Sequence, residues 1–133
     1  MHRYPRLSLE ESGDRVFAHL SSVSAATKAQ MAAACDMTPQ QVQRGLDYVR
    51  DVWAGEESQP LIYTPRTKEY SFALLQSQAD AYRQYRARVM AKQIRRLRTG
   101  TGSPALAKFG GPQLEYIDIQ LGRIQEDLER LAR

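Results

Sequence analysis

A short run of amide and guanidinium side chains is capable of specific hydrogen bonding to nucleic-acid bases. It contains Gln40, Gln41, Gln43 and Arg44. A glutamine amide can pair bidentately with adenine, and an arginine guanidinium can pair with guanine. Such pairing requires a rigid helix that presents these side chains to a groove, so the surrounding elements decide whether this chemistry can be used.

The residues around this run predict a capped helix. Thr38 suits the N-cap, Pro39 suits the first helical position, and Gln41 stands where a capping box has Glu or Gln. Apolar residues at helical spacing predict its buried stripe: Val42, Leu46, Val49 and Trp53. Thr38 and the amide groups of the first turn can also hold a phosphate.

Two further helices are predicted before this one. The first dozen residues suggest a loose arm, and a helix is expected to start after Ser12 or Asp14, with Val16 on its apolar face. Thr27 can cap a second, alanine-rich helix that runs through Cys35. A tight turn at residues 36–37 then leads into the glutamine-bearing helix.

A small hairpin is predicted after these helices. Residues 61–64 and 69–72 have the composition of strands, and Pro65 begins the turn between them. This predicts a two-stranded hairpin whose tip is made basic by Arg66 and Lys68.

The order of these elements resembles the winged helix-turn-helix family of DNA-binding proteins. The segments that carry the resemblance are TKAQMAAAC-DMT-PQQVQRGLDYV and LIYTPRTKEYSF, within about residues 9 to 73. The resemblance implies that the helix after Thr38 enters the major groove and that Lys28 contacts the DNA backbone. It also implies that Arg66 and Lys68 reach the neighbouring groove or its phosphates.

The second half of the chain predicts a long basic helix. Residues 74–98 contain no Gly or Pro, and a narrow apolar stripe includes Tyr82, Val89 and Leu97. Residues 79–98 hold seven Lys or Arg against one Asp, whereas residues 1–78 hold eight against nine acidic residues. The basic side chains are Arg83, Arg86, Arg88, Lys92, Arg95 and Arg96, with Arg98 at the end.

Two interpretations of this basic helix remain open. Its side chains can lie on phosphates, or they can pair with an acidic flank of the last helix. That flank consists of Glu115, Asp118, Glu126, Asp127 and Glu129. We favour the paired scaffold, because seven basic residues spread around a helix cannot all face one duplex.

The last segment predicts a helix with a heptad-type apolar seam. Residues 99–112 contain four glycines and two prolines and suggest a loop or hinge before it. The seam consists of Leu114, Ile117, Leu121, Ile124, Leu128 and Leu131. It can pack within the monomer, or it can pair with a second subunit. We favour dimerisation, which would resemble the helical arms of MarR-like and PadR-like regulators.

Composition argues against several other classes of protein. The chain has 133 residues, a net charge of +4 and a single cysteine, Cys35, so an intrachain disulfide is impossible. The first residues lack the apolar run typical of a signal peptide, and no apolar stretch approaches the length of a membrane span. We therefore expect a soluble, cytoplasmic, nucleoid-associated protein without membrane contact. His2 and His19 are the only histidines. They form no recognisable catalytic or zinc site with Cys35, so we expect no enzyme activity, metal or cofactor.

These features together predict an α+β, mainly α protein. Residues 1–73 are expected to form a winged helix-turn-helix domain, and residues 74–133 a helical arm. The expected function is sequence-specific binding of double-stranded DNA by a homodimeric transcriptional regulator. Two alternatives are a replication or partition factor of a mobile element, and a winged-helix scaffold that recruits a protein through its last helix.

Overall fold

The computed structural model describes residues 2–133, which form two compact units, residues 2–79 and residues 80–133. The fold is mainly helical and contains one small antiparallel sheet. This agrees with the mainly helical class that the sequence predicts. None of the helices within residues 2–133 is both long enough and apolar enough to cross a membrane.

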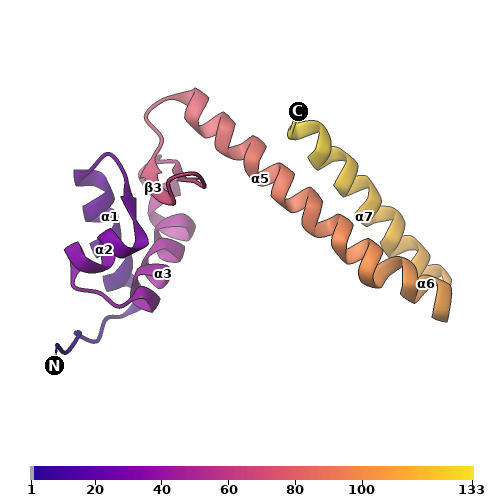
Figure 1. Ribbon diagram of the computed structural model, residues 1–133, viewed down its shortest axis with the longest axis horizontal. Coiled ribbons are helices and arrows are strands. Elements are labelled where there is room, and N and C mark those ends of the chain that lie inside the picture. Colours follow the sequence, from indigo (N-terminus) through magenta and orange to yellow (C-terminus); the bar gives the residue numbers. More distant parts are fainter. Residues whose placement is uncertain (1) are drawn as a thin grey trace. The chain divides into compact units, whose positions relative to one another are not determined.

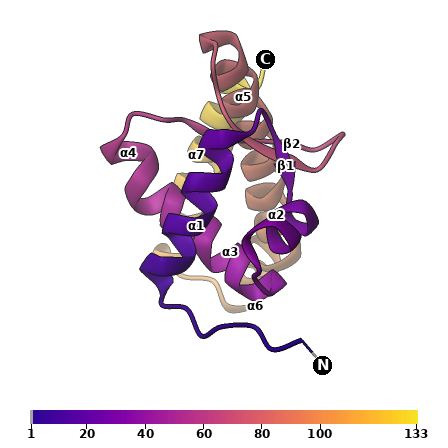
Figure 2. The same ribbon diagram turned by 90° about the vertical axis from the view of Figure 1, so that its left-hand side faces the viewer.

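The N-terminal unit combines three principal helices with a three-stranded sheet (Figure 2). In chain order its elements are α1 (Leu9–Ser22), β1 (Ala26–Thr27), α2 (Lys28–Cys35), α3 (Pro39–Tyr48), a π-helical turn (Val49–Trp53), α4 (Ala54–Glu56), β2 (Leu61–Thr64) and β3 (Glu69–Phe72). The strand order is β1-β3-β2, and both pairings are antiparallel.

The predicted hairpin of β2 and β3 is present, but the sheet contains a third strand that the sequence did not predict. Ala26 pairs with Tyr70, and Thr27 pairs with Glu69, so residues just before α2 form a third strand beside β3. A two-residue strand has no recognisable alternation of its own. It forms because β3 offers an open edge to the chain that leads into α2.

A continuous apolar core joins the helices to the sheet. Val16 from α1, Met31 from α2, and Val42 and Leu46 from α3 are fully buried, and Phe72 brings β3 against them. The stripe predicted for α3 faces this core. Its last member, Trp53, is only half-buried: it stacks on Phe17 and donates a 2.9 Å hydrogen bond from Nε1 to Asp14 Oδ1.

Helix α1 begins earlier than the sequence predicts. Ser8 is the N-cap, and Glu11 completes a capping box, which places Ser12 and Gly13 inside the helix and buries them. A Cβ on Gly13 would lie 2.3 Å from Tyr48 Cδ1, and one on Gly45 would lie 2.6 Å from Ser12 O. These two glycines therefore let α1 and α3 cross in direct contact.

The segment before α1 has no regular structure but makes defined contacts. The carbonyl of Pro5 accepts a 2.8 Å hydrogen bond from Gln41 Nε2, and His2 Nε2 lies 2.6 Å from Asp36 Oδ1. The expectation of a loose arm is therefore wrong for Pro5, because a hydrogen bond joins its carbonyl to the first turn of α3.

The C-terminal unit is a helical hairpin (Figure 1). It contains α5 (Gln76–Leu97) from Asp80 onward, a π-helical turn (Arg98–Gly102), α6 (Ser103–Phe109) and α7 (Pro112–Leu131). The expected hinge over residues 99–112 is mostly helical. The chain reverses only at Gly110 and Gly111, whose φ angles of 67° and 104° favour glycine.

An arginine clamp joins the two long helices near this reversal. Arg98 Nε donates to Asp118 Oδ1 at 3.2 Å, and Nη1 donates to Gln125 Oε1 at 3.1 Å. Farther along, Ala87 and Ala91 are the buried residues of α5. The predicted stripe through Tyr82, Val89 and Leu97 is therefore not the line that becomes buried. Of that stripe, Tyr82 and Val89 are half-buried and Leu97 is exposed.

Candidate nucleic-acid interface

Helices α2 and α3 are separated by a tight, well-defined turn. Asp36 caps α2 in the left-handed conformation, with φ of 53°. Thr38 then caps α3: its Oγ1 accepts from Gln41 N at 3.2 Å, while Gln41 Oε1 accepts from Thr38 N at 2.9 Å. Pro39 occupies the first turn. The structure thus contains the capping box that the sequence predicts, and the start of α3 is held rigidly.

The outward face of α3 carries part of the predicted base-reading set. Gln40 and Arg44 are exposed. Gln43 is half-buried, and its Nε2 donates to Asp47 Oδ1 at 3.0 Å. Arg50 Nη1 lies 3.2 Å from the same oxygen. Asp47 is thus partly neutralised within its own helical segment, which reduces its repulsion of a phosphate.

Gln41 differs from the other glutamines of α3. Its amide oxygen accepts from the Thr38 N–H group, and its amide nitrogen donates to the Pro5 carbonyl. Each end of the amide thus makes one hydrogen bond within the chain, and bidentate pairing with adenine would use the remaining donor and lone pair or replace these bonds. The amide of Gln41, which we predicted as a DNA contact, also links the start of α3 to the N-terminal segment.

Two predicted phosphate contacts lie in one hollow. A cavity of about 300 Å³ is lined by Thr27, Lys28, Tyr63, Thr67, Lys68 and Tyr70. Lys28 Nζ lies 6.0 Å from the centre of the Tyr70 ring. Neither lysine forms an ion pair within residues 2–133. The structure therefore brings together two cations that are 40 residues apart in sequence.

Some contributors to this hollow were absent from the predicted site. Tyr63 belongs to β2, and Thr67 belongs to the hairpin loop. The alternation of β2 was the available signal, because Ile62 is buried and its neighbours must face the other way. Arg66 lies at the exposed tip of the loop and does not line the hollow.

The predicted apolar seam of α7 divides into two sets. Leu114, Leu121 and Leu128, spaced by seven, are half-buried within the chain. Ile117, Ile124 and Leu131, also spaced by seven, are exposed by 46%, 48% and 65%. The first set therefore packs within the monomer. The second set, which we call the open set, remains exposed and is available to pair with a second subunit.

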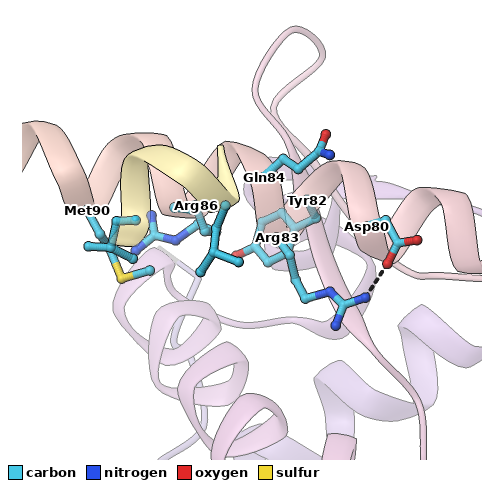
Figure 3. A pocket seen from close by; sticks show the side chains of 9 residues that line it. Asp80, Tyr82, Arg83, Gln84, Arg86 and Met90 are labelled. Carbon is cyan, nitrogen blue, oxygen red and sulfur yellow. Dashed lines mark hydrogen bonds and ion pairs between the residues drawn. The ribbon is translucent and has the colours of Figure 1, made fainter. Parts of the chain in front are cut away.

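Leu131, the last residue of the open set, lines a groove between α5 and the end of α7 (Figure 3). The groove encloses about 590 Å³, and Ala87, Met90, Leu128 and Leu131 supply apolar walls. Tyr82 and Arg86 also line it. Arg83 stands at the rim, paired with Asp80 of its own helix.

Within residues 2–133, the favoured pairing between the basic helix and the acidic flank of α7 is found at one residue only. Arg98 is the only basic residue predicted on the long helix that reaches an acidic side chain of α7, at Asp118. Asp127 instead pairs with Arg130 of its own helix. Within residues 2–133, the remaining five basic residues of α5 form no ion pair at all: Arg86, Arg88, Lys92, Arg95 and Arg96.

The residues considered for enzyme chemistry are Cys35, His2 and His19, and His2 contacts Asp36 beside Cys35. Cys35 is half-buried, and its Sγ lies 3.8 Å from the carbonyl oxygen of Arg15. Burial raises the pKa of the Cys35 thiol, an effect that the nearby Arg15 charge partly offsets. His19 is half-buried on α1. Among residues 2–133, no three His, Cys, Asp or Glu side chains gather in a group that could hold a metal ion.

Comparisons of this chain with protein-family models, with curated proteins and with solved structures find no match.

Proposed function

We propose that the N-terminal unit is a winged helix-turn-helix that binds double-stranded DNA in a sequence-specific manner. The order α1-β1-α2-α3-β2-β3 supports this proposal, because it sets a short helix, a tight turn and a capped helix before a basic hairpin. In this proposal α3 enters the major groove, and Gln40 and Arg44 read base edges. Gln43 also reads a base edge when its side chain exchanges the hydrogen bond to Asp47 for one to a base.

The convergence of Lys28 and Lys68 carries this proposal. Lys28 begins α2, Lys68 ends the hairpin turn, and both line one hollow. Lys68 has a φ of 59°, a conformation that side chains other than Gly, Asn and Asp rarely adopt. A lysine held at such a position, beside a second lysine that forms no ion pair within residues 2–133, is well suited to bind a backbone phosphate.

The remaining predicted residues have supporting roles in the proposal. Thr38 and the amide groups of the first turn of α3 contact a phosphate, and Arg66 extends from the hairpin tip towards the neighbouring groove. The chemistry proposed for the chain is occupancy of a DNA site, with no bond made or broken. The output is regulation of transcription from that site.

We also propose that the chain acts as a homodimer through the apolar side of its helical hairpin. Ile117, Ile124 and Leu131 support this, because an exposed aliphatic row is costly in water, and its last member, Leu131, also lines the groove. A two-fold dimer would present two copies of α3 to half-sites about one helical turn apart, or about 10 base pairs.

A titration of the full chain against labelled duplexes tests the proposed DNA contact. Arg44→Ala should weaken binding to a selected site by about 1–3 kcal/mol and should relax preference at one base position. Lys68→Asn, which tolerates the left-handed turn, should weaken binding to all sequences alike. Arg123→Ala is the control, since Arg123 is exposed on α7. The proposed reading face of α3 is wrong if Arg44→Ala binds the selected site as the control does.

A further inference from the structure

The two sides of the α5–α7 hairpin have different chemistry. Ala87 and Ala91 mark the line along which α5 is buried. On one side of this line lies the apolar groove of Figure 3, with Met90 and Leu131. On the other side lies a second hollow of about 270 Å³. Apart from Ala91, Ala132 and Glu129, that second hollow is lined by basic residues: Arg88, Lys92, Arg95 and Arg133. We call these four residues the basic flank.

Three of the four residues of the basic flank form a regular row on one face of α5. Arg88, Lys92 and Arg95 stand at positions i, i+4 and i+7 of α5, all three exposed, and they span about 10 Å at 1.5 Å per residue. One strand of B-DNA advances about 3.4 Å along the helix axis per phosphate, so a row of this length matches about three phosphates.

The charges of this row have no partner within the described chain. None of the four basic residues forms an ion pair within residues 2–133. Glu129, the one acidic residue of the hollow, accepts a 2.9 Å hydrogen bond from Gln125 Nε2. Like charges at i and i+4 destabilise a helix, so this row costs stability that a bound polyanion would recover.

The lining of the hollow favours the backbone of a duplex over other polyanions. Single-stranded nucleic acids are held by aromatic rings on which bases stack, and no aromatic residue lines this hollow. Membrane-surface helices and peptide grooves use large apolar anchors, whereas the apolar residues here are two alanines. Arginine guanidinium groups instead match phosphate oxygens bidentately.

We infer that the basic flank binds the phosphate backbone of double-stranded DNA and contributes affinity without sequence preference. This inference rests on the proposed DNA binding, but it concerns residues separate from α3. It assigns the two sides of the hairpin to different partners: the apolar side to a second copy of the chain, and the basic side to DNA.

The test compares two triple variants of the full chain that remove equal charge. The first, Arg88→Gln with Lys92→Gln and Arg95→Gln, neutralises the row. The control, Lys108→Gln with Arg123→Gln and Arg130→Gln, removes three exposed positive charges outside it. Binding to a mixed-sequence duplex is measured by fluorescence anisotropy from about 50 to 200 mM salt, the range over which counterion release is pronounced.

We expect the row variant to lower the slope of log K against log salt by about 2–3, since each phosphate contact contributes about 0.9. Affinity for mixed-sequence DNA should fall by about tenfold or more at low salt, and the control should lose much less. The ratio between selected and scrambled sites should not change. Arg88→Lys with Arg95→Lys should retain the slope and, by circular dichroism, the helix content.

Failure of this inference can be told apart from failure of the proposed function. If the full chain binds no DNA at low salt, both the proposed function and this inference are overturned. If it binds DNA, and the row variant matches either the wild type or the charge-matched control, only the basic flank is overturned. A row variant that loses preference for the selected site, while its salt slope is unchanged, contradicts the inference as well.

Discussion

The two units of the chain bury their side chains in different ways. The N-terminal unit contains a closed apolar core, in which Val16, Met31, Leu46 and Val49 have no exposed surface. In the C-terminal unit the buried apolar residues are Ala87 and Ala91. Larger side chains of this unit, such as Ile124, remain about half exposed.

This difference indicates that the units depend on partners to different degrees. A domain with a closed core gains most of its stability from its own packing, whereas two paired helices with few buried side chains are marginal in water. The N-terminal unit can therefore present a rigid surface alone. The C-terminal unit offers faces that a partner must cover, and the predictions below test this difference.

The largest effect is expected from truncating the N-terminal core. Leu46→Ala should lower the free energy of unfolding by about 2–5 kcal/mol, because Leu46 is fully buried. Leu128→Ala, at a half-buried position of α7, should cost about 1 kcal/mol or less in dilute protein. Urea unfolding followed by Trp53 fluorescence and by circular dichroism measures both. Equal losses in the two variants would remove the contrast between the units.

Two glycine substitutions sharpen the same contrast. Gly45→Ala should destabilise the chain by about 1–3 kcal/mol, because its Cβ would lie 2.6 Å from Ser12 O and from Val16 Cγ2. Gly100→Ala should stabilise the C-terminal unit by about 0.5–1 kcal/mol, because its Cβ would meet no atom within 4 Å. Thermal unfolding of both variants checks these signs. A stable Gly45→Ala protein would mean that α1 and α3 are not in close contact.

A charge placed in the open set of α7 should weaken self-association, because the dimer would bury it. Ile124→Asp should weaken self-association by about tenfold or more, or about 1.4 kcal/mol, if this side of the hairpin pairs with a second copy. Tyr116→Asp, at a residue of α7 that is 64% exposed, is the matched control. Sedimentation at several concentrations measures the mass of each. Parent and Ile124→Asp chains of equal mass at every concentration would place the dimer contact elsewhere or remove it.

The smallest effect concerns the one thiol. Because burial raises the pKa of the Cys35 thiol, less thiolate is present near neutral pH in the folded chain than in the unfolded chain. Alkylation by iodoacetamide at about pH 8 should therefore be slower in buffer than in urea. A thiol that reacts faster in the folded chain would indicate an activated cysteine.

The sequence predicted correctly those elements that are specified by contacts between residues close together in the chain. Thr38, Pro39 and Gln41 specify a helix start by contacts within one turn, and the structure contains them. The stripe through Val42 and Leu46 likewise depends only on helical periodicity. The Gly-rich segment did not follow its local signal, because glycine is tolerated inside a helix and only Gly110 and Gly111 need positive φ.

Features that depend on contacts between distant residues could not be predicted in this way. Gly13 suggests a loop by type, yet it lies within α1 because Tyr48 packs where its side chain would be. Strand β1 exists through its pairing with Tyr70 and Glu69. The sequence could not tell which residues of the α7 seam pack within the monomer, because Leu128 is half-buried and Leu131 is exposed only in the folded hairpin.

Selection of bound fragments from a random pool of duplex DNA by the full chain tests the central claim most directly. The account predicts that one sequence recurs, that it is two-fold symmetric with half-sites about 10 base pairs apart, and that Arg44→Ala changes the recovered bases. A pool that stays random after repeated rounds at low salt would contradict the claim that α3 reads DNA.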